Sequence, residues 1–229
     1  IEIENKQEQG NQQWKSSEVG TAQQESVRST TASSSSSQYT PQNVYVETPL
    51  FNLVFSTKGG VLTSAELTQF QLYDQNPVQL ISSRGQGLAL SLQQIDRIED
   101  LSKAEFVPDQ EIIRFQNGQK QLIMTAQLSN NRIIQKVYTF DSERYGFDLE
   151  VRYEGFSEDV DALIDWNGGV PFTEKDPEMD LLEMSSIASF NKERIEIQVD
   201  DNENETWDSE GGLQWIGARN KYFLTAIIP

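Results

Sequence analysis

Residues 147–154 have the sequence Phe-Asp-Leu-Glu-Val-Arg-Tyr-Glu, in which apolar and charged side chains alternate without a break. Successive side chains of a β-strand point to opposite faces of a sheet, so this alternation predicts a strand with one face in a core and the other in water. The same period of two recurs along the chain in residues 51–56, 88–92, 134–140 and 195–199, and an apolar run over residues 222–228 closes it.

Many short strands separated by turn residues are typical of antiparallel sheets packed face to face. We therefore expect an all-β sandwich over residues 41–229, with few short helices. The pair Asn117-Gly118 lies between two apolar runs and predicts a tight hairpin. Helical spacing is hard to find: Ile95, Ile98 and Leu101 lie three apart, but their segment is short and has no clear cap.

Three glycine pairs interrupt the pattern, at residues 59–60, 168–169 and 211–212. None lies in a glycine-rich phosphate-binding motif, and none opens a convincing helix. We expect them to supply backbone conformations with positive φ, or to let strands approach closely.

The first forty residues differ in composition from the rest. Gln, Ser, Thr and Asn make up 22 of the 40, including a run of five serines at residues 33–37. Such a segment has too little apolar surface to offset the entropy of ordering it, so we expect residues 1–40 to be a polar tether. Trp14 is its one tryptophan and is expected to be exposed.

Composition excludes several kinds of chemistry. The 229 residues contain no histidine and no cysteine, which removes Ser-His-Asp and Cys-His nucleophiles, histidine-ligated metals and disulfides. There is no apolar run of the ~18 residues that span a bilayer, and no signal peptide, so we expect a soluble polypeptide. The net charge of −18 would repel nucleic acid and anionic lipid.

The negative charge is concentrated in one part of the sequence. Residues 141–210 contain 22 acidic and 5 basic side chains, whereas residues 41–140 contain 9 acidic and 8 basic side chains. The last nineteen residues carry only Arg219 and Lys221. An apolar and weakly basic end of this kind suits a junction with a membrane surface.

One acidic segment partly matches a calcium-binding loop. Asp200, Asn202 and Asn204 have the alternating spacing of the first ligands of such a loop. However, Glu205 stands where the loop needs glycine, and Gly211 stands where it needs a bidentate glutamate. We therefore favour a solvated turn between strands and expect no metal and no cofactor.

Two further acidic clusters could supply the paired carboxylates of a glycosidase, but nothing in their spacing shows the required separation. We expect both to be solvated, the first as an exposed loop and the second as a sheet edge where like charges discourage edge-to-edge pairing. A sugar-stacking platform of tryptophans is a further alternative, although at least two of the three are expected in the core. The first cluster is Glu174, Asp176, Glu178 and Asp180, the second is Glu158, Asp159, Asp161 and Asp165, and the tryptophans are Trp166, Trp207 and Trp215.

Three stretches carry a family resemblance. Residues 44–60, VYVETPLFNLVFSTKGG, followed by Leu67, resemble the first strand and Gly-Gly turn of the large periplasmic domain of the YidC family of membrane protein insertases. Residues 211–217 and 221–229 are similar to the segment that ends this domain, and residues 166–171 resemble the version found in Bacteroidota-type insertases. The family-motif positions are Gly59, Gly60, Leu67, Gly211, Gly212, Tyr222, Phe223 and Pro229, and a surface at Trp166, Gly169 and Glu174 is expected to take part in interactions.

The resemblance implies a fold and a membrane context. The fold is a β-supersandwich similar to galactose mutarotase. In the family a transmembrane helix and a polar tether precede this domain, and five membrane helices that perform insertion follow it. The resemblance thus implies a fragment that meets the bacterial inner membrane only through missing helices, with its domain in the periplasm.

The resemblance also implies a role without catalysis. We expect a non-catalytic scaffold and docking surface for Sec translocon components or nascent membrane proteins. Epimerases with this fold use a histidine acid, which the chain lacks, and fold alone does not transfer function. A carbohydrate- or peptidoglycan-binding module of mutarotase-like fold is the alternative.

Overall fold

The alternating segments form strands in the computed structural model, which describes residues 40–81, 85–95, 97–157, 159–198 and 212–229. In chain order these strands are β1 Asn43–Glu47, β2 Phe51–Ser56, β3 Val61–Gln71, β4 Pro77–Gln79, β5 Gln86–Gln94, β6 Arg97–Asp100, β7 Val107–Pro108, β8 Ile112–Arg114, β9 Gln119–Gln127, β10 Ile133–Asp141, β11 Phe147–Glu154, β12 Asp161–Asn167, β13 Ser185–Phe190, β14 Glu193–Gln198, β15 Leu213–Arg219 and β16 Leu224–Ile227. The helices among the described residues are the 3₁₀ turn η1 Ser129–Asn131 and α1 Pro177–Leu181.

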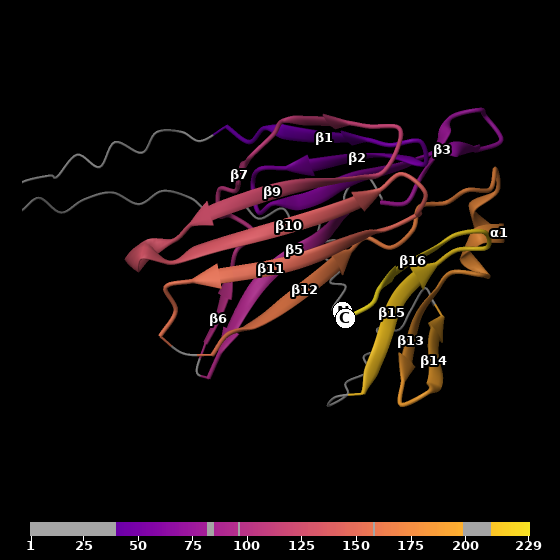
Figure 1. Ribbon diagram of the computed structural model, residues 1–229. Coiled ribbons are helices and arrows are strands. Elements are labelled where there is room, and N and C mark those ends of the chain that lie inside the picture. Colours follow the sequence, from indigo (N-terminus) through magenta and orange to yellow (C-terminus); the bar gives the residue numbers. More distant parts are fainter. Residues whose placement is uncertain (1–39, 82–84, 96, 158, 199–211) are drawn as a thin grey trace, which may run out of the picture. The chain divides into compact units, whose positions relative to one another are not determined.

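The strands form three sheets (Figure 1). The large sheet has the order β12-β5-β3-β2-β1-β8, with β4 added to β3 and β6 to β5; the middle sheet has the order β11-β10-β9-β7; and the C-terminal sheet has the order β14-β13-β15-β16. Neighbouring strands are antiparallel except for β1 and β8. The prediction of an all-β sandwich with few short helices is confirmed.

The core lies between the large and middle sheets. Phe55 of β2 is fully buried, and its ring centroid lies 4.7 Å from that of Tyr138 on β10. Phe140 and Phe147 complete this aromatic cluster from the middle sheet. Buried aromatic residues contribute large apolar areas, so these contacts join the two sheets into one core.

A lysine occupies a core position on β10. Ile134, Lys136 and Tyr138 face the same side of the strand, and all three are fully buried. The Lys136 ammonium donates to the carbonyl oxygens of Gly59, Gly60 and Leu88 at 3.1, 2.9 and 2.8 Å. Three bonds use all three of its donors, and this compensates for removing the charge from water.

The carbonyls that receive Lys136 belong to backbone that glycine makes accessible. Gly59 and Gly60 have φ values of 73° and 55°. A Cβ atom at Gly60 would lie 2.9 Å from the Phe106 ring, and one at Gly59 would lie 2.8 Å from the Ser102 carbonyl oxygen. Both the conformation and the close packing therefore require glycine. The prediction of positive φ is confirmed for the other described members of the glycine pairs, Gly168, Gly169 and Gly212, while Gly211 lies outside the described residues.

One local prediction is wrong, and one weak helical signal has no helix behind it. The Asn117-Gly118 turn does not join the strands of a hairpin, because β8 pairs with β1 of the large sheet whereas β9 pairs with β10 of the middle sheet. The helical spacing at 95–101 is also misleading, since β5 and β6 pair there as antiparallel strands. A turn signal marks where the chain reverses but does not select the strands' partners, and a short apolar spacing fits either structure.

The C-terminal sheet is less buried than the other two. Ile195 and Ile197 alternate as predicted and are half-buried in β14, while Val199 lies outside the described residues. The closing apolar run forms the edge strand β16, whose residues are half-buried or exposed. Among the described residues, β16 pairs only with β15.

Lys136 is expected to make stability depend on pH. Burial lowers the pKa of Lys136 to about 7, whereas an unfolded lysine titrates near 10.4, so between these values the unfolded chain binds more protons. The free energy of unfolding should therefore rise with pH. From pH 7 to pH 9 we expect it to rise by about 2 kcal/mol more in the native chain than in Lys136→Met, measured by urea unfolding.

The matched control is Lys120→Met, which removes an exposed lysine from the neighbouring strand β9. That variant should keep the pH dependence of the native chain. A native slope no steeper than that of Lys136→Met would show that the buried amine does not titrate in this range.

Candidate interaction surface

A groove with a volume of about 470 Å³ lies where four segments of the chain meet. The end of β3 and the following turn supply Phe70, Leu72 and Tyr73, and β4 supplies Val78. The other wall comes from the loop before α1 and from the turn between β15 and β16. We call this feature the aromatic groove; its lining is Phe70, Gln71, Leu72, Tyr73, Val78, Thr173, Glu174, Tyr222 and Phe223.

The aromatic rings of the groove contact one another across elements distant in sequence. The Phe70 ring lies edge-on to that of Phe223, with centroids 5.6 Å apart. The Phe70 ring centroid also lies 6.1 Å from that of Tyr145, whose hydroxyl donates to the Gln69 side chain at 3.2 Å. Edge-to-face packing is a favoured geometry for such pairs, so these contacts fix the ring orientations.

A buried aspartate holds the loop that forms one wall. The short helix α1 begins after Asp176, whose carboxylate accepts from the Glu178 amide, and Pro177 occupies its first turn. This places the Asp180 carboxylate, which is fully buried, against the backbone amides of Thr173 and Glu174 and the Thr173 hydroxyl. Charge-assisted bonds of this kind are strong and compensate for the burial.

Asn220 connects this loop to the turn between β15 and β16. Its Nδ2 donates to the Pro171 carbonyl at 2.9 Å and to the Thr173 hydroxyl at 3.3 Å. Its Oδ1 accepts from the backbone amides of Tyr222 and Phe223 at 2.9 and 2.8 Å. The amide side chain therefore fixes both walls of the aromatic groove together.

Glu174 forms a second bridge between the same two segments. Its carboxylate accepts from the Lys221 ammonium at 2.8 Å and from the Tyr222 hydroxyl at 2.6 Å. The Lys221 bond, followed by that of Tyr222, lowers the pKa of Glu174, and the same contact with Glu174 raises the pKa of Lys221. The structure thus brings Glu174 together with the family-motif positions Tyr222 and Phe223.

The acidic clusters have structural partners. The expectation that residues 174–180 form an exposed loop is wrong for Asp180, which lies in α1 and is buried against backbone amides, whereas Asp176 is exposed in the loop and caps the helix. The solvated edge is confirmed for Asp159, Asp161 and Asp165, which are exposed on or next to the edge strand β12. Glu158 and the calcium-like residues 200–205 lie outside the described residues. Among the residues that the structure describes, no cluster of carboxylates could hold a metal ion.

Trp166 and Gly169 lie apart from the lining of the groove. Trp166 is half-buried on β12. Its ring packs against Gly87, where an added Cβ atom would lie 2.9 Å from the ring. Its indole nitrogen is buried without a hydrogen-bond partner among the described residues. Trp215 is half-buried on β15, and Trp14 and Trp207 lie outside the described residues.

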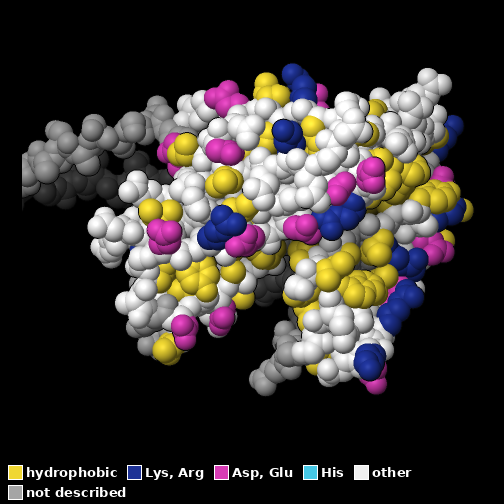
Figure 2. Space-filling view, viewed as in Figure 1, with side chains coloured by type: hydrophobic (Ala, Val, Ile, Leu, Met, Phe, Trp, Pro, Cys, Tyr) yellow, Lys and Arg dark blue, Asp and Glu magenta, His cyan; other side chains and the backbone are white. Residues whose placement is uncertain are grey.

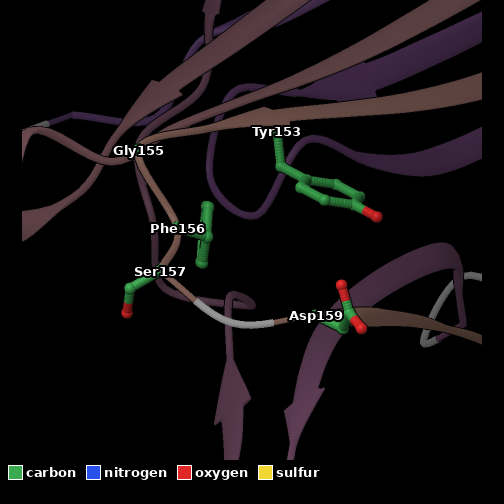
Figure 3. Close-up of a pocket in the computed structure, with 5 residues that line it drawn as sticks. All are labelled: Tyr153, Gly155, Phe156, Ser157 and Asp159. Atoms are coloured by element: carbon green, nitrogen blue, oxygen red, sulfur yellow. The ribbon is translucent and has the colours of Figure 1, made fainter.

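A second hollow, of about 460 Å³, follows the end of β11. In Figure 3 Tyr153 lies above Asp159, Phe156 lies to the left of both, and Ser157 points away. Arg132 lies 5.1 Å from the centre of the Phe156 ring and pairs with Glu99 at 2.6 Å. A single exposed carboxylate beside aromatic rings does not provide an acid–base pair.

The exposed aromatic residues Phe70 and Tyr73 were absent from the sequence expectations. The available signal was Tyr73 immediately before Asp74-Gln75-Asn76-Pro77, a turn sequence in which an aromatic ring is readily exposed.

Neither helix in the described part of the chain has the length and hydrophobicity of a transmembrane segment.

Comparison with known proteins shows similarity over nearly all of the described region. A family profile described as YidC periplasmic domain matches residues 43–229. A membrane protein insertase YidC of Chlorobaculum parvum is 28% identical over 207 residues, covering 83% of this chain and 34% of the relative. The corresponding proteins of Chlorobium phaeovibrioides and Syntrophus aciditrophicus are 29% and 28% identical, covering 82% of this chain and 34% and 36% of their own lengths. The chain thus spans about a third of the length of these relatives.

Asp180 is expected to be required for the shape of the groove. In Asp180→Ala, the carboxylate that accepts from the Thr173 and Glu174 amides is lost, so these buried donors are left unpaired. We expect a loss of about 2–3 kcal/mol in the free energy of unfolding, measured by urea titration. Glu178→Gln changes an exposed acid of the same helix and should cost less than about 0.5 kcal/mol; equal losses in the two variants would contradict the assignment.

Proposed function

The chain belongs to the family of YidC periplasmic domains, and from this premise we propose that it is a non-catalytic docking domain of a membrane protein insertase. Family membership places it in the periplasm, as part of an inner-membrane protein. The observation that carries the proposal is the aromatic groove, whose exposed rings are held by polar bonds between distant segments. Membrane protein insertion is the activity for which the longer relatives are named, and for this chain it is part of the proposal.

The bonding of the acidic side chains supports a role without catalysis. Glu174 is occupied by Lys221 and Tyr222, and Asp180 is occupied by backbone amides. A general acid or base needs a titratable group free to reach a substrate proton. These two carboxylates instead hold the shape of a surface.

Exposed aromatic residues support a docking role. Tyr and Phe are enriched at protein interfaces because they bury a large area at low entropic cost. Tyr73 and Tyr222 are 64% and 59% exposed at the rim of the aromatic groove. The edge of β16, which follows Tyr222 and Phe223, offers backbone groups for strand addition. By family resemblance, the partners proposed are Sec translocon components and nascent membrane proteins.

Site-specific photo-cross-linking in the full-length insertase tests the docking role. A benzophenone amino acid at Tyr222 should cross-link to a translocon component or a nascent membrane protein identified by mass spectrometry. The same probe at Tyr153, an exposed tyrosine in the other hollow, is the matched control. Absence of such partners at Tyr222, or equal yields at the two positions, would contradict docking through this surface.

The charge of the chain predicts weak contact with lipid. A net charge of −18, mostly within residues 141–210, opposes approach to anionic head groups. In co-sedimentation at low salt, we expect the chain to remain unbound with vesicles containing 30% phosphatidylglycerol. Tight association, abolished by added salt, would show that a cationic face governs its contacts.

A further inference from the structure

The hollow at the end of β11 has an aromatic ring that continues a row of core side chains. Leu149 and Val151 lie on the same face of β11 as Tyr153, and both pack against the core. Tyr153 comes at the end of this row and is 45% exposed. Figure 2 shows a patch of hydrophobic side chains over the end of β11, with acidic side chains above and below it. The strand therefore presents an aromatic ring to solvent beside the hollow.

Phe156 supplies a second ring, nearly at a right angle to the first. The centroids of the Tyr153 and Phe156 rings lie 5.8 Å apart, with an interplanar angle of 81°. The turn between them requires Gly155, which has a φ of 78° and where a Cβ atom would lie 2.6 Å from the Asn131 carbonyl oxygen. Arg132 lies 5.1 Å from the Phe156 centroid but does not line the hollow. These contacts hold the two rings in place before any ligand binds.

Asp159 places a carboxylate beside the two rings. In Figure 3 it lies below Tyr153 and to the right of Phe156, across the hollow from both. Asp159 is exposed, and the next residue, Val160, is buried in the core and anchors this part of the loop. Within the part of the chain that the structure describes, no group forms a hydrogen bond or an ion pair with the Asp159 carboxylate.

The arginines adjacent to the two rings do not neutralise Asp159, because each is paired with another acid. Arg132 forms two bonds with Glu99, at 2.6 and 3.0 Å, and Arg152, which precedes Tyr153, forms two with Glu150, at 2.9 and 2.7 Å. The hollow also lies in the acidic segment 141–210, which contains 22 acidic and 5 basic side chains. A field of this sign attracts cations and repels anions.

We propose that this hollow binds the alkylated ammonium group of an organic cation. A cation within about 6 Å of an aromatic face is attracted by the ring, and aromatic cages recognise quaternary ammonium groups in this way. Tyr153, Phe156 and Asp159 would surround the positive group on three sides, and a volume of about 460 Å³ accommodates an ion the size of choline. The hollow is separate from the aromatic groove, so the inference goes beyond the proposed docking function and does not depend on it.

An organic cation fits the hollow better than two other small ligands. A neutral sugar would cover Asp159 without supplying an opposite charge, and covering an unpaired charge is costly. A sugar also stacks flat on one ring, whereas here a second ring stands at 81° to the first. A divalent metal ion needs several oxygen ligands, and the described residues contain no cluster of carboxylates that could hold one.

An NMR titration of the full chain, labelled with ¹⁵N, tests this inference. The probe is choline, and its control is 3,3-dimethylbutan-1-ol, which has a closely similar shape but no charge. We expect choline to shift the amide signals of Tyr153, Phe156 and Asp159 and to bind about tenfold more tightly than the alcohol. Tyr153→Leu and Asp159→Asn should each weaken choline binding about fivefold or more. Tyr73→Leu and Asp161→Asn, matched changes at other exposed residues, should leave it within about twofold of the native value.

Several results would overturn the inference. These are absence of choline binding, equal binding of choline and the alcohol, and choline binding that Asp159→Asn leaves unchanged. Binding of N-acetylglucosamine that Tyr153→Leu abolishes, with no choline bound, would assign the hollow to a sugar and would overturn the inference as well.

Vesicles distinguish the two sources of such a cation. Co-sedimentation with phosphatidylcholine vesicles that is lost in Asp159→Asn would support the inference and assign the site to a lipid head group. Choline binding without this co-sedimentation would support it and assign the site to a free organic cation. The cross-linking test at Tyr222 concerns the aromatic groove, so its outcome does not bear on this site.

Discussion

The Lys136 ammonium joins the two sheets of the sandwich by bonding the backbone carbonyls of Gly59, Gly60 and Leu88. β10 belongs to the middle sheet, whereas these carbonyls lie in and before strands of the large sheet. Buried charge is costly unless every donor is satisfied, so the geometry of these three carbonyls is strongly constrained. Tyr138 adds a bond from its hydroxyl to the Gly60 carbonyl at 3.1 Å, and burial raises its pKa. Hydrophobic contacts supply the area of the core, while these polar bonds specify how its sheets are aligned.

The aromatic groove depends on a second set of polar bonds at a different place in the fold. Asp180 orders the loop before α1, and Asn220 joins that loop to the turn preceding β16. As a consequence, Phe223 lies against Phe70, and Tyr222 bonds Glu174. Groups that resemble a catalytic cluster in sequence therefore serve to position a surface, which is consistent with a family whose relatives are named as insertases.

Sequence reasoning was most successful where a pattern repeats over several residues. The alternation in 51–56 and 147–154 predicted strands correctly, because a period of two has a direct geometric cause. It was least successful for single residues and for pairing. Lys136 occupied a core position in the alternating pattern, but only its three carbonyl partners explain why a charge is tolerated there. The turn at Asn117-Gly118 was recognisable, although its flanking strands pair in separate sheets.

The order of residues by itself determined the all-β class, the glycine positions with positive φ, the absence of histidine and cysteine chemistry, and the family. All of these depend on local conformational preference or on composition. The tertiary structure alone decided that Asp180 is buried, that Lys136 spans two sheets, and that Phe70 meets Phe223 across 153 positions of chain. Such contacts form only when separate sheets pack together, because the free energy that selects them comes from burial and from hydrogen bonds between distant segments.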